Sequence, residues 1–241
     1  MTGSQAATRH TDRSYEADLA KLRENILLMG AKVEELLTQA LSAFVERDSD
    51  LARQTLQGDT EVDRLELEID EQCLRILAKR QPVASDLRFI TSTMKLVTDL
   101  ERIGDLAVNV CERVIELTEE SPLSAMTTIT RMGAVTTEML RGALDSFVSG
   151  DADAARAVIE RDSVVDATYA QLFPELVAVM MDDPKCVYRA TRLQSVGKYL
   201  ERIADHATNV AEMVVFMVEG EDVRHAWGLS RGTDRSGSGL V

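Results

Sequence analysis

Apolar residues recur at steps of three and four positions along most of the chain. Between Leu19 and Phe44 this spacing predicts an amphipathic helix. A second run stops before Pro82, because proline disfavours a helical conformation in the residue before it. A third run extends from about Asp86 to Val114, and no stretch alternates long enough to predict a strand. The apolar positions of the first two runs are Leu22, Ile26, Met29, Val33, Leu36, Ala40 and Phe44, then Leu65, Ile69, Cys73 and Ile76.

The second half of the chain repeats the first. VERDSDLARQ, from Val45, matches VSGDADAARA, from Val148, at an offset of 103 residues. LERIGDLAVNVCE, from Leu100, matches LERIADHATNVAE, from Leu200, at an offset of 100. The two offsets differ by three residues, and we place this difference in the loop between the second and third helices of a half. We therefore predict an all-α fold of two tandem three-helix bundles, with six long helices of roughly thirty residues or ~45 Å each.

Local signals place the boundaries of the two bundles at residues 14–118 and 121–218. Ser121 followed by Pro122 is typical of a helix start. The fifth helix is expected to end near Asp183, and Pro174 within it predicts a kink.

The two ends of the chain lack periodic apolar positions. Residues 1–13 are predicted to be disordered. Residues 219–241 are rich in glycine and serine and are predicted to form a flexible tail. His225 and Trp227 lie in this tail, where a frayed terminus is a more common explanation than a docking element.

The composition is strongly acidic and limits the partners. Asp and Glu outnumber Lys and Arg by 41 to 27, a net charge of −14 that repels nucleic acid and anionic lipid. No apolar run approaches the ~18 residues of a membrane span or resembles a signal peptide, so we expect no membrane insertion. Cys73, Cys111 and Cys186 are too scattered for a disulfide framework or a CxxC site. A cytoplasmic location is expected.

The repeated motif carries a stripe of carboxylates. Glu101 and Asp105 are four residues apart and share one helix face with Asn109 and Glu112. Two carboxylates at this spacing repel by roughly 0.2–0.5 kcal/mol even when exposed, so a pair built in twice indicates compensation by a cation or an arginine. Arg102 directly follows the glutamate and is expected to point away from the stripe. The second stripe consists of Glu201, Asp205, Asn209 and Glu212, followed in the same way by Arg202.

The second helix of each half adds another acidic pair at the same spacing. If this helix and the next form an antiparallel hairpin turning near Ala84, Asp63 and Asp105 reach the same height. Carboxylates converging from two helices form an all-oxygen site suited to metal ions such as Fe, Mn, Mg or Ca, with Zn also possible. The added pairs are Asp59 and Asp63 in the first half, and Asp162 and Asp166 in the second.

A simpler interpretation remains open beside the metal site. Charged stripes are usually solvated helix faces, and spacing alone does not decide between the two. His206 follows Asp205 and could add a ligand, although a histidine with a structural hydrogen bond is more common. Asp99 lies off the stripe.

LERIGDLAVNVCE and LERIADHATNVAE resemble the paired E(D)xxxD signatures of the PhoU family, regulators of bacterial phosphate uptake. The resemblance covers all but the chain ends and includes Asp86, Leu87 and Arg88 at the head of the third helix. The second repeat has Cys186, Val187 and Tyr188 in that register.

This resemblance implies a cytoplasmic, homodimeric helical adaptor. Such a protein represses the phosphate-starvation response, acting between the ATPase subunit of a phosphate ABC transporter and a membrane sensor histidine kinase. It also implies metal ions, such as Fe, Zn, Mn or Mg, on Glu101, Asp105, Glu201 and Asp205.

Two other functions are kept beside the regulatory adaptor, which is not expected to be an enzyme. A di-metal carboxylate oxidase normally needs Glu-x-x-His pairs on two helices. The nearest match in the sequence is Asp222-x-x-His225, in the tail. A helical interaction module without metal is the third possibility.

Overall fold

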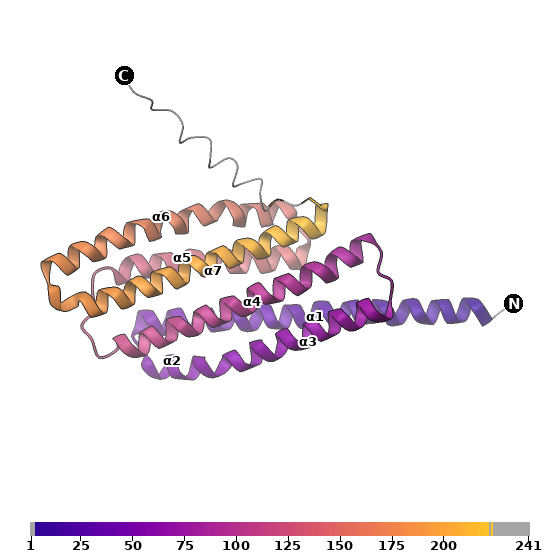
Figure 1. Cartoon of the computed structure of the whole chain (residues 1–241), viewed down its shortest axis with the longest axis horizontal. Helices are drawn as coiled ribbons and strands as arrows, with labels where there is room; N and C mark the ends of the chain where they lie inside the picture. The colour runs from indigo at the N-terminus through magenta and orange to yellow at the C-terminus, as the bar shows by residue number, and fades with distance from the viewer. Residues whose placement is uncertain (1–2, 222, 224–241) are drawn as a thin grey trace, which may run out of the picture.

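The computed structural model describes residues 3–221 and 223, which form long α-helices joined by short connections (Figure 1). No strand occurs within this described part of the chain, so the all-α prediction is confirmed. The helices are α1 (Gly3–Glu46), α2 (Ser49–Thr55), α3 (Asp59–Lys79), α4 (Ala84–Leu117), α5 (Met126–Ser149), α6 (Ala152–Asp182) and α7 (Val187–Glu219), with short 3-10 helices at Leu56–Gly58 and Pro184–Cys186.

The helices pack as two three-helix bundles that lie side by side. In the first bundle α1, α3 and α4 contact one another, and in the second α5, α6 and α7 do so. The bundles meet where α4 packs against α7 and α1 against α5. As a result α3 and α6, the corresponding helices of the two repeats, lie at opposite outer edges of the molecule (Figure 1). The predicted apolar positions from Leu22 to Phe44 are all buried in the shared core.

Two helix boundaries differ from the expectation. α1 already begins at Gly3, whereas residues 1–13 were predicted to be disordered; this segment contains no proline, and helix propagation adds one hydrogen bond for each residue fixed. The second helix of the first repeat is divided into α2 and α3, while its counterpart α6 is continuous. The division falls at Gly58, a poor helix former, where a Cβ would lie 2.7 Å from Leu36 of α1.

The end of the chain is described only as far as residue 223, without residue 222. α7 ends at Glu219, and Gly220 caps it in a left-handed conformation with φ of +79°. Asp222, His225 and Trp227 lie outside the described residues, as do most positions of the predicted flexible tail.

The repeat is also visible in the backbone where α1 and α5 end. Arg47 and Gly150 occupy equivalent positions, and both adopt positive φ, of 56° and 64° respectively. Asp48 and Asp151 follow them, and each accepts hydrogen bonds from backbone N–H groups of the next helix as its N-cap. Glycine takes the left-handed conformation at little cost, but arginine does not. The first repeat therefore holds a strained turn where the second has a relaxed one.

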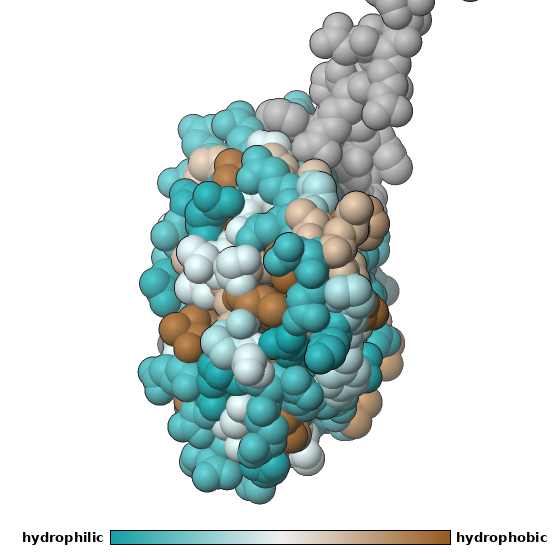
Figure 2. All heavy atoms as spheres, turned by 90° about the vertical axis from the view of Figure 1, so that its left-hand side faces the viewer, coloured by the Kyte–Doolittle hydropathy of each residue, from teal (hydrophilic) through white to brown (hydrophobic). Residues whose placement is uncertain are grey.

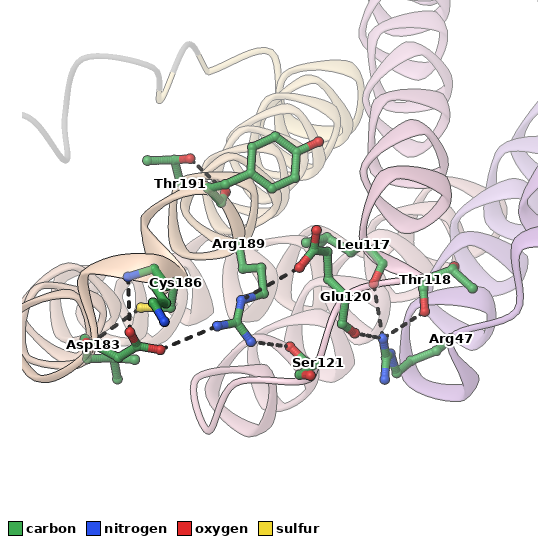
Figure 3. Close-up of polar contacts among 12 residues, drawn as sticks. Arg47, Leu117, Thr118, Glu120, Ser121, Asp183, Cys186, Arg189 and Thr191 are labelled. Atoms are coloured by element: carbon green, nitrogen blue, oxygen red, sulfur yellow. Dashed lines mark hydrogen bonds and ion pairs between the residues drawn. The ribbon is translucent and has the colours of Figure 1, made fainter.

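The hydrogen bonds of the Arg47 side chain explain why an arginine occupies this strained position. Its Nη2 donates to the carbonyl oxygens of Leu117 and Thr118 at 3.0 and 2.9 Å and to that of Glu120 (Figure 3). On the other side of the same segment, Arg189 of α7 donates to the carbonyl of Ser121 at 2.9 Å. Two arginines, one from each bundle, thus bind the backbone that connects the repeats.

The surface at this end of the molecule is mixed. Figure 2 shows a mostly hydrophilic face with separate apolar patches. Exposed apolar side chains at or near helix ends here include Val45 of α1, Met181 of α6, and Val187 and Tyr188 of α7.

α6 is the one helix among the described residues whose length and composition would allow it to cross a membrane. Core helices of soluble bundles have the same property, and α6 packs against α5 and α7. However, only 22% of its most apolar stretch is buried. Its apolar character therefore extends to the outer edge of the molecule.

Candidate carboxylate sites

The first carboxylate cluster lies between α3 and α4. Its members are Asp59, Asp63, Glu66 and Asp70 on α3, and Glu101 and Asp105 on α4. Burial and the negative charges of Asp63 and Asp105 raise the pKa of Asp59. Asp59 Oδ1 lies 3.5 Å from the position a Cβ of Gly104 would take, so this carboxyl faces the α4 motif directly. The hairpin geometry predicted from the sequence thus brings the α3 and α4 carboxylates together.

Glu101 is the most perturbed member of the first cluster. Its side chain is only 15% exposed. The pKa of Glu101 is raised to about 7, first by burial and then by the charge of Asp105, while Arg102 opposes the increase. A carboxyl with this pKa is partly protonated at neutral pH unless a cation compensates its charge.

Arg102 turns toward this cluster instead of away from it. Its Nη1 donates to Asp105 at 2.8 Å, and its Nε lies 3.3 Å from Glu101. The expectation that Arg102 points away considered only the direction of its Cα–Cβ bond, whereas the long side chain can reach back along the helix. One arginine cannot balance six carboxylates. Within the described residues, the buried oxygens Asp59 Oδ1 and Asp70 Oδ1 have no hydrogen-bond partner.

Glu66 and Asp70 were missed in the sequence. They continue the series 59, 63, 66 and 70, which follows one helix face at steps of four and three. Extending the recognised pair by two turns would have found them. Burial raises the pKa of Glu66, and the charges of Asp70, Asp63 and Asp105 add to the increase, which places Glu66 beside carboxylates of both α3 and α4.

The second carboxylate cluster consists of Asp162 and Asp166 on α6 and Glu201 and Asp205 on α7. The pKa of Asp205 is raised by partial burial, then by Glu201 and Asp166, and is opposed by Lys198 and His206. Lys198 Nζ donates to Glu201 at 2.5 Å, whereas the equivalent position in α4 is Thr98.

The two clusters are therefore not equivalent. The α6 positions that correspond to Glu66 and Asp70 are Tyr169 and Phe173. Tyr169 accepts a hydrogen bond from Gln194 at 2.8 Å. The second cluster has two carboxylates fewer and gains a lysine, so the first is the more negative of the two.

The donor chemistry of both clusters suits a hard cation, because carboxylate oxygens are the usual ligands of such ions. In the conformations of the described residues, however, no three Asp, Glu, His or Cys side chains converge closely enough to hold a metal ion. Side-chain rotation would be needed to gather the ligands. Metal binding by the eight residues named from the sequence stays a prediction.

His206 takes part in a different contact. Its Nδ1 lies 2.7 Å from Asp99 Oδ1, and Asn209 Nδ2 donates to the same oxygen at 3.0 Å. This group joins α7 to α4 across the boundary between the bundles. Asp99, which has tyrosine as its equivalent in the second repeat, anchors the contact. The structural interpretation of His206 agrees with this geometry.

Comparison with known proteins gives matches over nearly the whole chain. The family model described as "PhoU domain" matches residues 26–114 and again 129–214, one match for each bundle. The "Phosphate-specific transport system accessory protein PhoU homolog" of Pseudomonas putida is 42% identical over 235 residues, 97% of this chain and 91% of that protein.

Solved structures agree with these matches. The crystal structure of PhoU from Pseudomonas aeruginosa is 42% identical, with a TM-score of 0.84 over 86% of this chain and 100% of that one. The phosphate transport system regulatory protein PhoU from Streptococcus pneumoniae is 29% identical, with a TM-score of 0.81 over 87% of this chain and 99% of that one. With both repeats matched in sequence and in fold, the chain belongs to the PhoU family.

Proposed function

We propose that this protein is a cytoplasmic regulator of phosphate uptake that represses the phosphate-starvation response when phosphate is plentiful. The observation that carries the proposal is the match of both repeats to the PhoU domain over most of the chain. The relatives' names add support, since they denote an accessory protein of phosphate-specific transport and a regulatory protein of that system. Long helices that expose large faces suit binding to other proteins.

The partners we propose are the ATPase subunit of a phosphate ABC transporter, a membrane sensor histidine kinase and a second copy of this chain. In this role the protein is an adaptor and not an enzyme. The protein would signal through which of its surfaces are free to bind a partner. The two inequivalent clusters give each repeat its own surface chemistry, which suits contact with different partners.

We further propose that the carboxylate clusters bind metal ions. Asp59, Asp63, Glu101 and Asp105 would hold a cation in the first cluster, and Asp162, Asp166, Glu201 and Asp205 in the second. A bound divalent ion supplies positive charge that offsets the repulsion among the carboxylates. The proposal is supported by the raised pKa of Asp59, Glu101 and Asp205, whose charged forms are disfavoured first by burial and then by neighbouring carboxylates.

A reporter experiment tests the regulatory role. The gene would be deleted in its own host carrying a phosphate-starvation reporter, and the strain complemented with the wild-type gene. The deletion should derepress the reporter in phosphate-rich medium and complementation should restore repression. Unchanged reporter activity in the deletion strain, with the protein normally expressed in the parent, would contradict the proposal.

Elemental analysis of untagged protein tests metal binding separately. A variant with Glu101, Asp105, Glu201 and Asp205 replaced by alanine should lose metal that the wild type retains. The matched control is Asp50→Ala with Asp153→Ala, equivalent positions in the two repeats whose side chains are 96% and 98% exposed. Equal metal content in all three proteins would show that the clusters are solvated faces, as in a metal-free interaction module.

The oxidase alternative makes a different prediction. An iron-loaded sample would then consume peroxide with turnover that the four-alanine variant lacks. Nothing observed among the described residues favours this function.

A further inference from the structure

The outer face of α6 is uncharged over most of its length. We define the α6 outer face as the exposed residues Ser163, Val164, Ala167, Ala170, Gln171, Phe173, Pro174, Ala178 and Met181. It covers about 27 Å at 1.5 Å per residue. The side chains of Val164, Phe173 and Met181 are 48%, 60% and 81% exposed. The face is uncharged although the chain as a whole carries a net charge of −14.

The acidic residues of this segment do not belong to the face. Asp166 contributes to the second cluster toward α7, where it raises the pKa of Asp205. Glu175 accepts a hydrogen bond from Thr128 of α5 at 2.8 Å. Both carboxylates are partly buried against neighbouring helices. The solvent-facing side is left without a charge from residue 163 to residue 181.

The equivalent face of α3 is charged and provides an internal comparison. At the offset of 103 residues, Glu61, Arg64 and Glu68 of α3 correspond to Val164, Ala167 and Gln171 of α6, and Glu71 and Arg75 correspond to Pro174 and Ala178. On α3 these residues pair along the helix at 2.6–2.8 Å. An exposed bundle helix of this fold can therefore carry charges at all five positions, and α6 carries none.

We propose that the α6 outer face binds the same face of a second copy, forming a symmetric antiparallel helix pair. This inference rests on the homodimer included in the proposed function and names its interface. Two copies with a charge of −14 each repel one another wherever charged faces meet. The α6 outer face is a surface on which they can approach without that repulsion. A two-fold axis makes such a contact self-complementary, as in most homodimers.

The charges that flank the face favour the antiparallel direction. Glu160 and Arg161 precede the face, with Arg161 paired to Glu138 of α5, and Asp182 and Asp183 follow it. Crossing the two helices near Gln171 in opposite directions brings each Arg161 toward Asp182 of the partner subunit. A parallel pair would instead place the acidic Asp182 and Asp183 ends of the two copies together. The short side chains of Ala167, Ala170 and Ala178 let two helices approach closely between the larger apolar residues.

Sedimentation velocity between about 1 and 100 µM tests the interface. The key variant carries Val164→Glu, Ala167→Arg and Gln171→Glu, which transfers the α3 charges to α6. These three residues already pair on α3, so helix content and melting temperature should stay close to wild type. The matched control is Glu61→Arg, Arg64→Glu and Glu68→Arg, which changes the same three positions on α3 while preserving its ion pairs.

The expected result is a wild-type dimer, a control that dimerises equally well, and an α6 variant whose dimerisation is weakened at least tenfold. A folded α6 variant that dimerises like wild type would overturn this interface but would not contradict the proposed homodimer. A wild type that stays monomeric to 100 µM would overturn both, while the reporter experiment would still test the regulatory role on its own.

Chemical cross-linking tests the direction of the pair. Gln171→Cys lies near the proposed two-fold axis, and Glu68→Cys is its α3 counterpart. The natural cysteines are buried, so they should contribute little background. A short bismaleimide should join two Gln171→Cys chains and leave Glu68→Cys chains separate. Equal cross-linking of both variants would overturn the α6 pairing, as would efficient linking of the Glu68→Cys variant alone.

Discussion

His206 Nδ1 on α7 lies 2.7 Å from Asp99 Oδ1 on α4, and the contact crosses the boundary between the two repeats. The two side chains are 19% and 14% exposed. Each differs from its repeat equivalent, because position 106 is leucine and position 199 is tyrosine. α4 and α7 are equivalent helices of the two repeats, but the residues that make this contact are not repeated between them.

Removing either partner of this contact should destabilise the protein. We expect His206→Leu to lower the free energy of unfolding by about 0.5–1.5 kcal/mol, the usual net value of a hydrogen bond, and Asp99→Ala to lower it further, because the bond from Asn209 is lost as well. Urea unfolding of both single variants and the double variant measures the coupling between them. Purely additive effects would contradict a direct interaction.

Stability should depend on pH through Glu101. Its folded pKa, about 7, is above the ordinary value of 4.5, so the folded state binds this proton more tightly than the unfolded state. The stabilising contribution is complete below about pH 4.5 and is lost as pH rises through 7. With chelator present, Glu101→Gln should gain about 1–3 kcal/mol on wild type between pH 5 and pH 8. A constant difference across this range in urea unfolding would refute the pKa assignment.

Which residues share a helix face could be predicted from the sequence better than which neighbouring helix covers that face. The series beginning at Asp59 and Glu101 follows from helix periodicity and hairpin length, and the structure brings these residues together. The contact between Asp99 and His206 could not be foreseen, because periodicity identifies a buried face without saying which bundle covers it. The direction of Arg102 was also missed, since a long side chain has several accessible rotamers.

The difference between the clusters should appear in cation binding. Lys198 compensates Glu201 in the second cluster, and its removal leaves that charge for a metal ion. We expect Lys198→Met to bind Mn²⁺ several-fold more tightly at the second cluster, and Arg202→Met, which removes an equal charge from an exposed position, to leave affinity nearly unchanged. Titration calorimetry of both variants, with Asp59→Asn and Asp105→Asn added to silence the first cluster, gives the comparison. Equal affinities would show that Lys198 does not control the site.

The strained turn at Arg47 predicts an order of stabilities. Arg47→Ala and Arg47→Gly both lose the hydrogen bonds to the segment that links the repeats, but only glycine accepts a φ of 56° without steric cost. The glycine variant should be more stable than the alanine variant by about 1 kcal/mol, and both should be less stable than wild type. Urea unfolding gives the order, and an alanine variant as stable as the glycine variant would contradict the strain.

Two helical glycines should respond in opposite ways to alanine. At Gly197 of α7 a Cβ would lie 2.3 Å from the buried Leu172 of α6, so Gly197→Ala must displace a packed side chain and should cost about 1–3 kcal/mol. At Gly104 of α4 the nearest atoms lie 3.5 Å away, an ordinary contact, and the second repeat has Ala204 there. Gly104→Ala should therefore stabilise the protein by up to about 1 kcal/mol through helix propensity. Thermal unfolding of both variants tests these two expectations. If both substitutions change the stability in the same direction, packing between α6 and α7 is no tighter than packing between α3 and α4.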